Sequence, residues 1–345
     1  MAIFNPDSWT LLQGVLVFSV CALVITIAGT RITRVVDQLA DRTGLGEATA
    51  GAVLLGAATS LSGSVLSVTA AYRGHPELAV SNALGGIAVQ TFFLAIADMA
   101  YRRANLEHAA ASAPNMMQNG LLIALLSLIV LAPNLPDVTF WHIHPVTPIL
   151  LGFYLYGTQL IQGAWESPMW RPSITGDTRE DKPEAMSRLP PLLRLWTEFA
   201  VLMATLGLAG LVLEPAATTI STEAGLSQTV VGVLLTAIST SIPELVTSIA
   251  AVRRGALTLA VGGIIGGNAF DTLFMAASDI AYRDGSIYHT MSTDMERWVT
   301  LTLLMAAILI MGLIRRERYG VGGIGAESLA IMVLYLLGVG LMFSG

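Results

Sequence analysis

The stretch TSIPELVTS at residues 240–248 decides the fold, because a second version of it, TSLSGSVLS, occupies residues 59–67. Both belong to a longer internal match, in which residues 44–102 align without a gap onto residues 225–283 with 24 identical pairs among 59. A match of this length between two parts of one chain indicates duplication. We therefore expect two structurally related halves.

The composition indicates a protein embedded in lipid. Hydrophobic residues make up 54% of the 345 positions and charged residues 12%, which is about half the charged share of soluble domains. A helix that crosses a bilayer needs about 20 mostly apolar residues. Ten such stretches lie at residues 9–30, 47–72, 77–100, 117–133, 146–164, 192–214, 228–252, 257–281, 298–314 and 326–343. This pattern argues against a cytosolic enzyme, a nucleic-acid-binding protein and, with Cys21 as the single cysteine, a disulfide scaffold.

The basic residues predict the orientation. When the loops are assigned alternately to two sides, fifteen arginine and lysine residues fall on one side and three on the other. Basic loops remain in the cytoplasm, so we expect a multi-pass protein of the cell membrane with both termini outside. Residues 165–191 are expected to form a central cytoplasmic linker between a first half, residues 1–164, and a second half, residues 192–345.

Each half contains five predicted spans, and this odd number makes the second half enter the membrane from the opposite face. Inverted repeats are typical of secondary transporters, which bind their substrate near the midplane where the repeats meet. The predicted fold is an all-α integral membrane protein with ten transmembrane helices in two inverted five-helix repeats. A duplicated channel or scaffold would show the same pattern, so this alternative stays open here.

Glu244 and Asp271 are the two acidic residues predicted near the centre of a span. A carboxylate there costs on the order of several kcal/mol unless it meets a cation or a polar cavity. Thr240 and Ser241 share a helical face with Glu244, and Pro243 is expected to break the helix and free backbone carbonyls. Such oxygen atoms suit hard cations such as Na⁺ and Ca²⁺, with protons as competitors. The alternative is a pair of protonated carboxyls that only hold helices together.

These residues resemble the α-repeat of the sodium/calcium exchanger (cation/calcium antiporter) superfamily, in its prokaryotic type. Against the family pattern G-[ST]-S-x-P-E-x-x-x-S, this sequence reads Ser239-Thr240-Ser241-Ile242-Pro243-Glu244. Against the later pattern G-N-x-x-G-S-N-x-x-[ND], it reads Gly266-Gly267-Asn268 and then Asp271. The resemblance covers nearly the whole chain. It implies a secondary active antiporter that exchanges Ca²⁺ or another cation against Na⁺ or H⁺ by alternating access, with the first and sixth spans sliding over the other helices.

The resemblance also implies the residues that bind the cation. Glu244 is the implied principal ligand. The residues implied to complete or flank the sites are Asp271, Asn268, Ser241, Thr240, Ser60, Thr59 and Asn82.

The first repeat departs from the family pattern. Ser62 and Gly63 stand where proline and glutamate are expected, Ile87 replaces an asparagine and Gln90 replaces an asparagine or aspartate, although Asn82 is retained. The loss of a carboxylate weakens a divalent site and favours a monovalent ion or a proton. The alternatives are therefore an exchanger-derived membrane protein with altered or lost transport, and a proton-coupled monovalent cation antiporter.

The expected partners are the transported cations and the lipid bilayer, with no nucleic acid and no resident cofactor. No histidine lies within a predicted span to act as a base for a serine nucleophile, so we expect no enzymatic activity. Arg31, Arg34 and Arg42 alternate with apolar residues, which predicts a segment that lies on the cytoplasmic surface. The ion pair, the stoichiometry and the oligomeric state stay open.

Overall fold

A computed structural model describes residues 9–43, 55–101, 104–166, 190–320 and 324–343, together with Trp170 and Ser173. Most of the predicted central linker lies outside these residues. Within them the chain is almost wholly helical, with one isolated bridge between Phe140 and Ile143. Seven helices are long and apolar enough to cross a membrane. The all-α membrane architecture is thereby confirmed, whereas the count of ten transmembrane helices stays a prediction.

The helices of the two halves correspond in order, and two of the pairs also correspond in length. The first half contains α1 (Leu11–Thr43), α3 (Gly56–Thr59), α4 (Leu61–Tyr72), α5 (Pro76–Ala100), α6 (Leu106–Ala109), α7 (Ala113–Leu131), the 3₁₀ turn η4 (Ala132–Asn134) and α8 (Val146–Glu166). The second half contains α9 (Leu192–Ala224), α10 (Gln228–Val230), the π-helical η6 (Val231–Thr236), α11 (Ala237–Arg254), α12 (Leu257–Ala281), the 3₁₀ helix η7 (Ile287–Thr290), α13 (Thr293–Arg315) and α14 (Ala326–Met342). Both ends of α1 lie 181 positions before those of α9, and the same holds for α5 and α12. The repeat therefore extends beyond the sequence match to include the first helix of each half.

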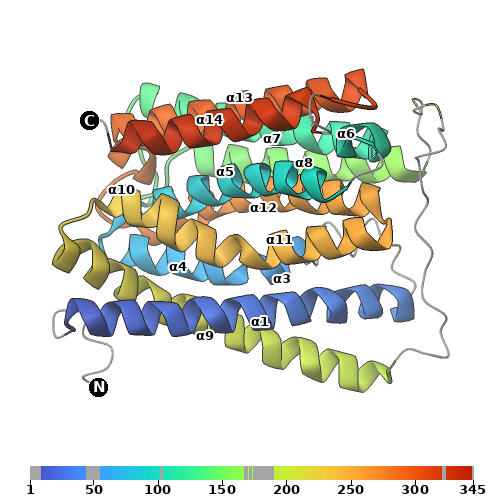
Figure 1. Ribbon diagram of the computed structural model, residues 1–345. Coiled ribbons are helices and arrows are strands. Elements are labelled where there is room, and N and C mark those ends of the chain that lie inside the picture. The colour runs from blue at the N-terminus through green and yellow to red at the C-terminus, as the bar shows by residue number, and fades with distance from the viewer. Residues whose placement is uncertain are drawn as a thin grey trace.

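Equivalent helices of the two halves run antiparallel. Arg31 near the end of α1 pairs with Glu198 near the start of α9 at 2.5 Å, whereas Gly14 near the start of α1 packs on Thr219 near the end of α9. This arrangement confirms the inverted repeat. Figure 1 shows α1 and α9 side by side along one face of the bundle, with α4, α5, α11 and α12 in its interior and α13 and α14 on the opposite side.

The prediction of a separate surface segment at Arg31, Arg34 and Arg42 is wrong, because all three belong to α1. The apolar residues that alternate with them do not face lipid. Val35 and Leu39 are buried against Leu195 at the start of α9. The two long helices thus cover each other's apolar stripes, which explains why α1 continues far beyond the predicted span.

The expected helix break at Pro243 is also wrong, because α11 continues through this proline. Proline removes one hydrogen-bond donor, but the residues around it keep helical geometry. The irregular backbone lies elsewhere. The π-helical η6 directly precedes α11, and in the first repeat Ser60 interrupts the helix between α3 and α4. Such π-helical segments occur frequently at functional sites.

Candidate cation site

The eight predicted site residues lie in the interior of the bundle, on α11, α12, α5 and the junction of α3 and α4. Their exposed fractions range from 0% to 7%. Small residues allow the helices to approach closely there. A Cβ atom on Gly86 of α5 would lie 3.8 Å from Asp271 Oδ2, and one on Gly267 of α12 would lie 3.4 Å from Gln90 Oε1. The glycines of the repeat therefore let α5 and α12 bring polar side chains together.

Gln90 connects three helices at this site. Its Nε2 donates to Asp271 Oδ2 at 2.7 Å and to Ser241 Oγ at 3.3 Å, which joins α5 to α12 and α11. From its type alone, Gln90 is interpreted only as the replacement of a lost ligand. One signal was available, because Gln90 lies 181 positions before Asp271 and is therefore its counterpart in the first repeat.

Many oxygen atoms at the site lack a hydrogen donor. Among the described residues, no well-formed hydrogen bond reaches the atoms Glu244 Oε1 and Oε2, Asp271 Oδ1, Asn268 Oδ1, Asn82 Oδ1, Gln90 Oε1 and Ser60 Oγ, although Thr59 lies close to the Glu244 carboxyl and Ser60 close to that of Asp271. Buried polar atoms are nearly always paired, so a cluster of exceptions needs an explanation. Carboxylate, amide and hydroxyl oxygens are the ligands that hard cations take. The donor set therefore fits a cation better than it fits helix packing alone.

A cavity of about 400 Å³ reaches Glu244. Thr59, Thr247 and Ser248 line it together with the Glu244 side chain, and so do Arg34, Asp37 and Arg253. Arg253 follows Glu244 on α11 by a helical rise of about 13 Å, so the arginines lie away from Glu244 along the cavity. Water and ions can enter a space of this size and polarity. Glu244 thus lies at a cavity that is lined by polar and charged side chains as well as apolar ones, although the residue is only 6% exposed.

The two threonines at the site have matching hydrogen bonds. Thr59 Oγ1 donates to the carbonyl oxygen of Leu55 at 3.0 Å, and Thr240 Oγ1 donates to that of Thr236 at 2.9 Å. These four residues are counterparts in the two repeats. In each case the hydroxyl proton is directed back along the helix, which leaves the oxygen lone pairs free to accept.

The two asparagines hold neighbouring helices together through their amide groups. Asn268 Nδ2 donates to Thr91 Oγ1 at 3.0 Å, which joins α12 to α5. Asn82 Nδ2 donates to the Gly63 carbonyl at 3.1 Å and to Ser67 Oγ at 2.9 Å, which joins α5 to α4. Asn268 therefore connects the two repeats, whereas Asn82 connects two helices within the first repeat.

Gly63 faces the same interior, but an aromatic ring fills the space in front of it. A Cβ atom at Gly63 would lie 3.1 Å from Phe274 Cε2 and 3.6 Å from Thr240 Oγ1. A glutamate at this position would displace the ring. The first repeat therefore contributes hydroxyl and amide groups to the site but no carboxylate. Among the described residues no group of three or more acidic, histidine or cysteine side chains is arranged to hold a metal ion.

A separate group of buried acids lies near the arginines that end α13. Asp98 accepts hydrogen bonds from the backbone N–H groups of Leu106 at 2.6 Å and Gly325 at 3.0 Å. Glu107 of α6, outside the spans, accepts from Ser328 Oγ at 2.6 Å. Burial, and secondly the nearby Asp98 charge, raise the pKa of Glu107 to about 7.

The Glu107 carboxyl predicts a pH dependence of stability. Its pKa is raised from an ordinary value of 4.5, so the native state keeps a proton that the unfolded chain releases. Stability should therefore fall as pH rises from about 4.5 to about 7 and stay lower above that. We expect Glu107→Gln to reduce this fall in melting temperature, whereas the exposed Glu223→Gln should leave it unchanged. A parent-like pH slope in Glu107→Gln would contradict the assignment.

Comparisons with known proteins give a consistent result. A family model described as sodium/calcium exchanger protein matches residues 13–160 and 195–344. The putative antiporter CaxA of Alkalimonas amylolytica is 28% identical over 260 residues, which cover 73% of this chain and 76% of that protein. The sodium/calcium exchanger MaX1 of Methanosarcina acetivorans is 42% identical over 87 residues, 25% of this chain and 23% of that one.

Two solved structures share the fold. The H⁺/Ca²⁺ exchanger CAX has a TM-score of 0.71 at 13% identity, covering 96% of this chain and 85% of its own. The sodium-calcium exchanger NCX_Mj has a TM-score of 0.62 at 16% identity, covering 96% of this chain and 99% of its own. At these identities the likeness shows the arrangement of helices.

Proposed function

Since this chain belongs to the sodium/calcium exchanger family and is a secondary active cation antiporter, we propose that Glu244 and Asp271 form the centre that binds the exchanged cations. The supporting observation is the set of buried oxygen atoms without a hydrogen donor around these two carboxylates. Ser241, Asn268 and Ser60 supply neutral oxygens. Gln90 holds Asp271 and Ser241 in place through its amide group.

The charge of this centre limits what it binds. No ion pair joins Glu244 or Asp271 to a basic residue in the part of the chain that the structure describes. Two buried carboxylates without a cationic partner carry two negative charges, which low-dielectric surroundings penalise strongly. One divalent cation or two monovalent cations neutralise them. The centre therefore suits Ca²⁺ or a similar divalent ion in exchange for two Na⁺ or two H⁺.

The cavity gives this centre a route to one side of the membrane. Arg34 and Arg253 line its far end, and the distribution of basic residues favours the cytoplasm as the side that it opens to. Accordingly, both termini lie outside the cell membrane. The α1–α9 pair moves across the core in the transport cycle, which closes this cavity and opens a route on the other side.

A proton is a specific candidate for the counter-ion. When no divalent cation is bound, neutralisation of two buried carboxylates requires protons or sodium ions. Counterflow in proteoliposomes distinguishes the two: Ca²⁺ uptake is measured with an outward Na⁺ gradient or with a pH gradient alone. Uptake that is driven by the pH gradient at zero Na⁺ identifies H⁺. Absence of uptake under every cation gradient would contradict the proposed function.

The charge count also predicts electroneutral exchange. A centre with two carboxylates carries no net charge with either set of ions bound, so an imposed potential should do little work on it. We expect the initial rate of Ca²⁺ uptake to change less than about twofold when K⁺ and valinomycin set the potential at 0 or −100 mV. Movement of one net charge per cycle would instead add about 2.3 kcal/mol per 100 mV to the driving force. The ratio of internal to external Ca²⁺ at the end of uptake would then rise with the imposed potential.

A further inference from the structure

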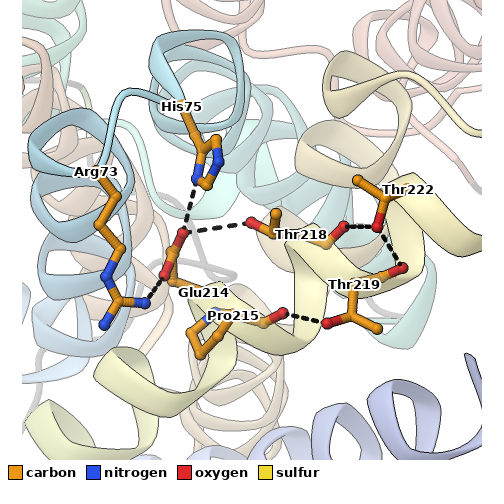
Figure 2. Close-up of polar contacts among 7 residues, drawn as sticks. All are labelled: Arg73, His75, Glu214, Pro215, Thr218, Thr219 and Thr222. Atoms are coloured by element: carbon orange, nitrogen blue, oxygen red, sulfur yellow. Dashed lines mark hydrogen bonds and ion pairs between the residues drawn. The ribbon is translucent and has the colours of Figure 1, made fainter. Parts of the chain in front are cut away.

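Another buried acid, Glu214, forms a cluster that the cation site does not use. The Glu214 side chain on α9 is 0% exposed and forms an ion pair with Arg73 Nη1. Its Oε1 lies 3.0 Å from His75 Nδ1 and accepts from Thr218 Oγ1 at 3.3 Å. Figure 2 shows Arg73 and His75 approaching Glu214 from the same side, with Thr218 one helical turn further along α9. The Glu214 carboxylate thus differs from the carboxylates of the cation centre, because it already has cationic and neutral hydrogen-bond donors.

The cluster connects a mobile element to the core. Arg73 directly follows α4 and His75 directly precedes α5, so both belong to the turn between two core helices. Glu214 belongs to α9, which packs along α1. The cluster therefore attaches the α1–α9 pair to the α4–α5 turn.

This attachment lies at the opposite end of α1 from the cavity. Thr219, which follows Glu214 on α9 by just over one turn, packs on Gly14 near the start of α1. The cavity instead contacts α1 from Thr30 to Asp37, in its second half. One end of the α1–α9 pair is thus attached to the core by the cluster, whereas the other end borders the cavity.

The second repeat lacks the same attachment. The counterpart of Glu214 is Thr33 and that of His75 is Ala256, each 181 positions away. Thr33 lines the cavity, and its hydroxyl donates to the Gly29 carbonyl of its own helix at 3.0 Å. A carboxylate therefore occupies this position on α9 but not on α1, and among the described residues the attachment is found at only one end of the pseudo-symmetric structure.

We propose that Arg73, His75 and Glu214 form a latch that holds the exchanger in the state with its cavity open at the arginine-rich end. This proposal rests on the alternating cycle described above. Movement of α9 away from the α4–α5 turn separates the ion pair and opens the opposite route. Arg73 is already one-third exposed, so the separated charges would enter water. The latch thus sets the balance between the two open states, without contacting the transported cation.

Cysteine accessibility tests the latch in purified protein without any transport measurement. The background is Cys21→Ser, which removes the only native thiol. Ala250→Cys places a thiol in the cavity, and Thr69→Cys places one at the counterpart position on α4. Each is labelled with a water-soluble maleimide, alone and combined with Glu214→Gln or Arg73→Gln.

Release of the latch should change the two labelling rates in opposite directions. We expect labelling at position 69 to rise about tenfold and labelling at position 250 to fall, because population moves from one open state to the other. Partial unfolding would raise both rates, so it is distinguished directly. His75→Gln should give a smaller change of the same sign. Unchanged rates at both positions in Glu214→Gln or in Arg73→Gln would overturn the proposal.

The latch and the cation centre can fail separately. If Glu244→Gln still transports but Glu214→Gln shifts the labelling as described, the centre is wrong and the latch stands. If transport depends on Glu244 but the labelling rates do not respond to Glu214, the latch is wrong and the centre stands.

Discussion

Replacement of Glu244 by glutamine should reduce cation exchange on the order of 100-fold or more. Glutamine keeps the size of the side chain and the shape of the cavity but removes the negative charge. Loss of about 3 kcal/mol of cation binding corresponds to that factor, and calcium sites depend on the number of charged ligands. Initial rates of Ca²⁺ uptake in proteoliposomes measure the effect. The exposed Glu223→Gln is the matched control and should transport like the parent.

The same substitution should stabilise the protein when no cation is present. The Glu244 carboxylate accepts no well-formed hydrogen bond from the described residues, so its ionised form is costly in the native state. We therefore expect Glu244→Gln to melt at a higher temperature than the parent in cation-free buffer. Added Ca²⁺ should raise the melting temperature of the parent but not of the variant. Near-parental exchange by a folded Glu244→Gln variant would remove this residue from the mechanism.

Two glycines at equivalent positions should be intolerant of any side chain. A Cβ atom on Gly29 of α1 would lie 2.4 Å from Pro243 Cγ on α11. One on Gly210 of α9 would lie only 2.3 Å from the carbonyl oxygen of Ser62 on α4. Both distances are far below van der Waals contact, so a side chain at either position would force the long helices to shift. These two glycines lie 181 positions apart and mark where the α1–α9 pair contacts the core most closely.

We expect Gly29→Ala and Gly210→Ala each to reduce exchange by about tenfold or more. Overpacking typically costs about 1–3 kcal/mol, and here it falls on the contact that must move. Uptake rates and melting temperatures measure the two effects. Gly152→Ala on α8 is the control, because no atom lies within 4 Å of its Cβ position. If Gly29→Ala and Gly210→Ala transported at the rate of Gly152→Ala, close helix contact at these glycines would not matter for transport.

The sequence was sufficient to predict the helical fold and the acids at its centre. Both predictions depend on features that a single sequence shows directly: the internal match, the apolar stretches and two charges within them. Glu244 and Asp271 stand out because lipid-spanning segments carry few acids. Their helices were also found with accurate bounds, since α12 covers the residues of the predicted span 257–281.

The contacts between distant parts of the chain were not predictable in this way. Gln90 is neutral and resembles a lost ligand until the structure shows its amide group on Asp271 and Ser241. Glu214 is the last residue of the predicted span 192–214, although α9 continues to Ala224. Its partner Arg73 lies 141 positions earlier.

Local rules also fail where packing dominates. Pro243 removes one backbone donor, yet α11 remains helical because its neighbours on α1, α5 and α12 surround it. Gly63 seemed to leave an incomplete site, but the Phe274 ring occupies the space in front of it. The ring belongs to the other repeat, so its position depends on how the halves meet.

Direct cation binding tests the central claim that Glu244 and Asp271 hold the transported ion. Isothermal titration of the purified protein with Ca²⁺ at constant pH should give one saturable site in the parent and in Glu223→Gln. The heat of binding should vanish in Glu244→Gln and weaken at least about tenfold in Asp271→Asn. Unaltered Ca²⁺ affinity in both of these variants would contradict the claim.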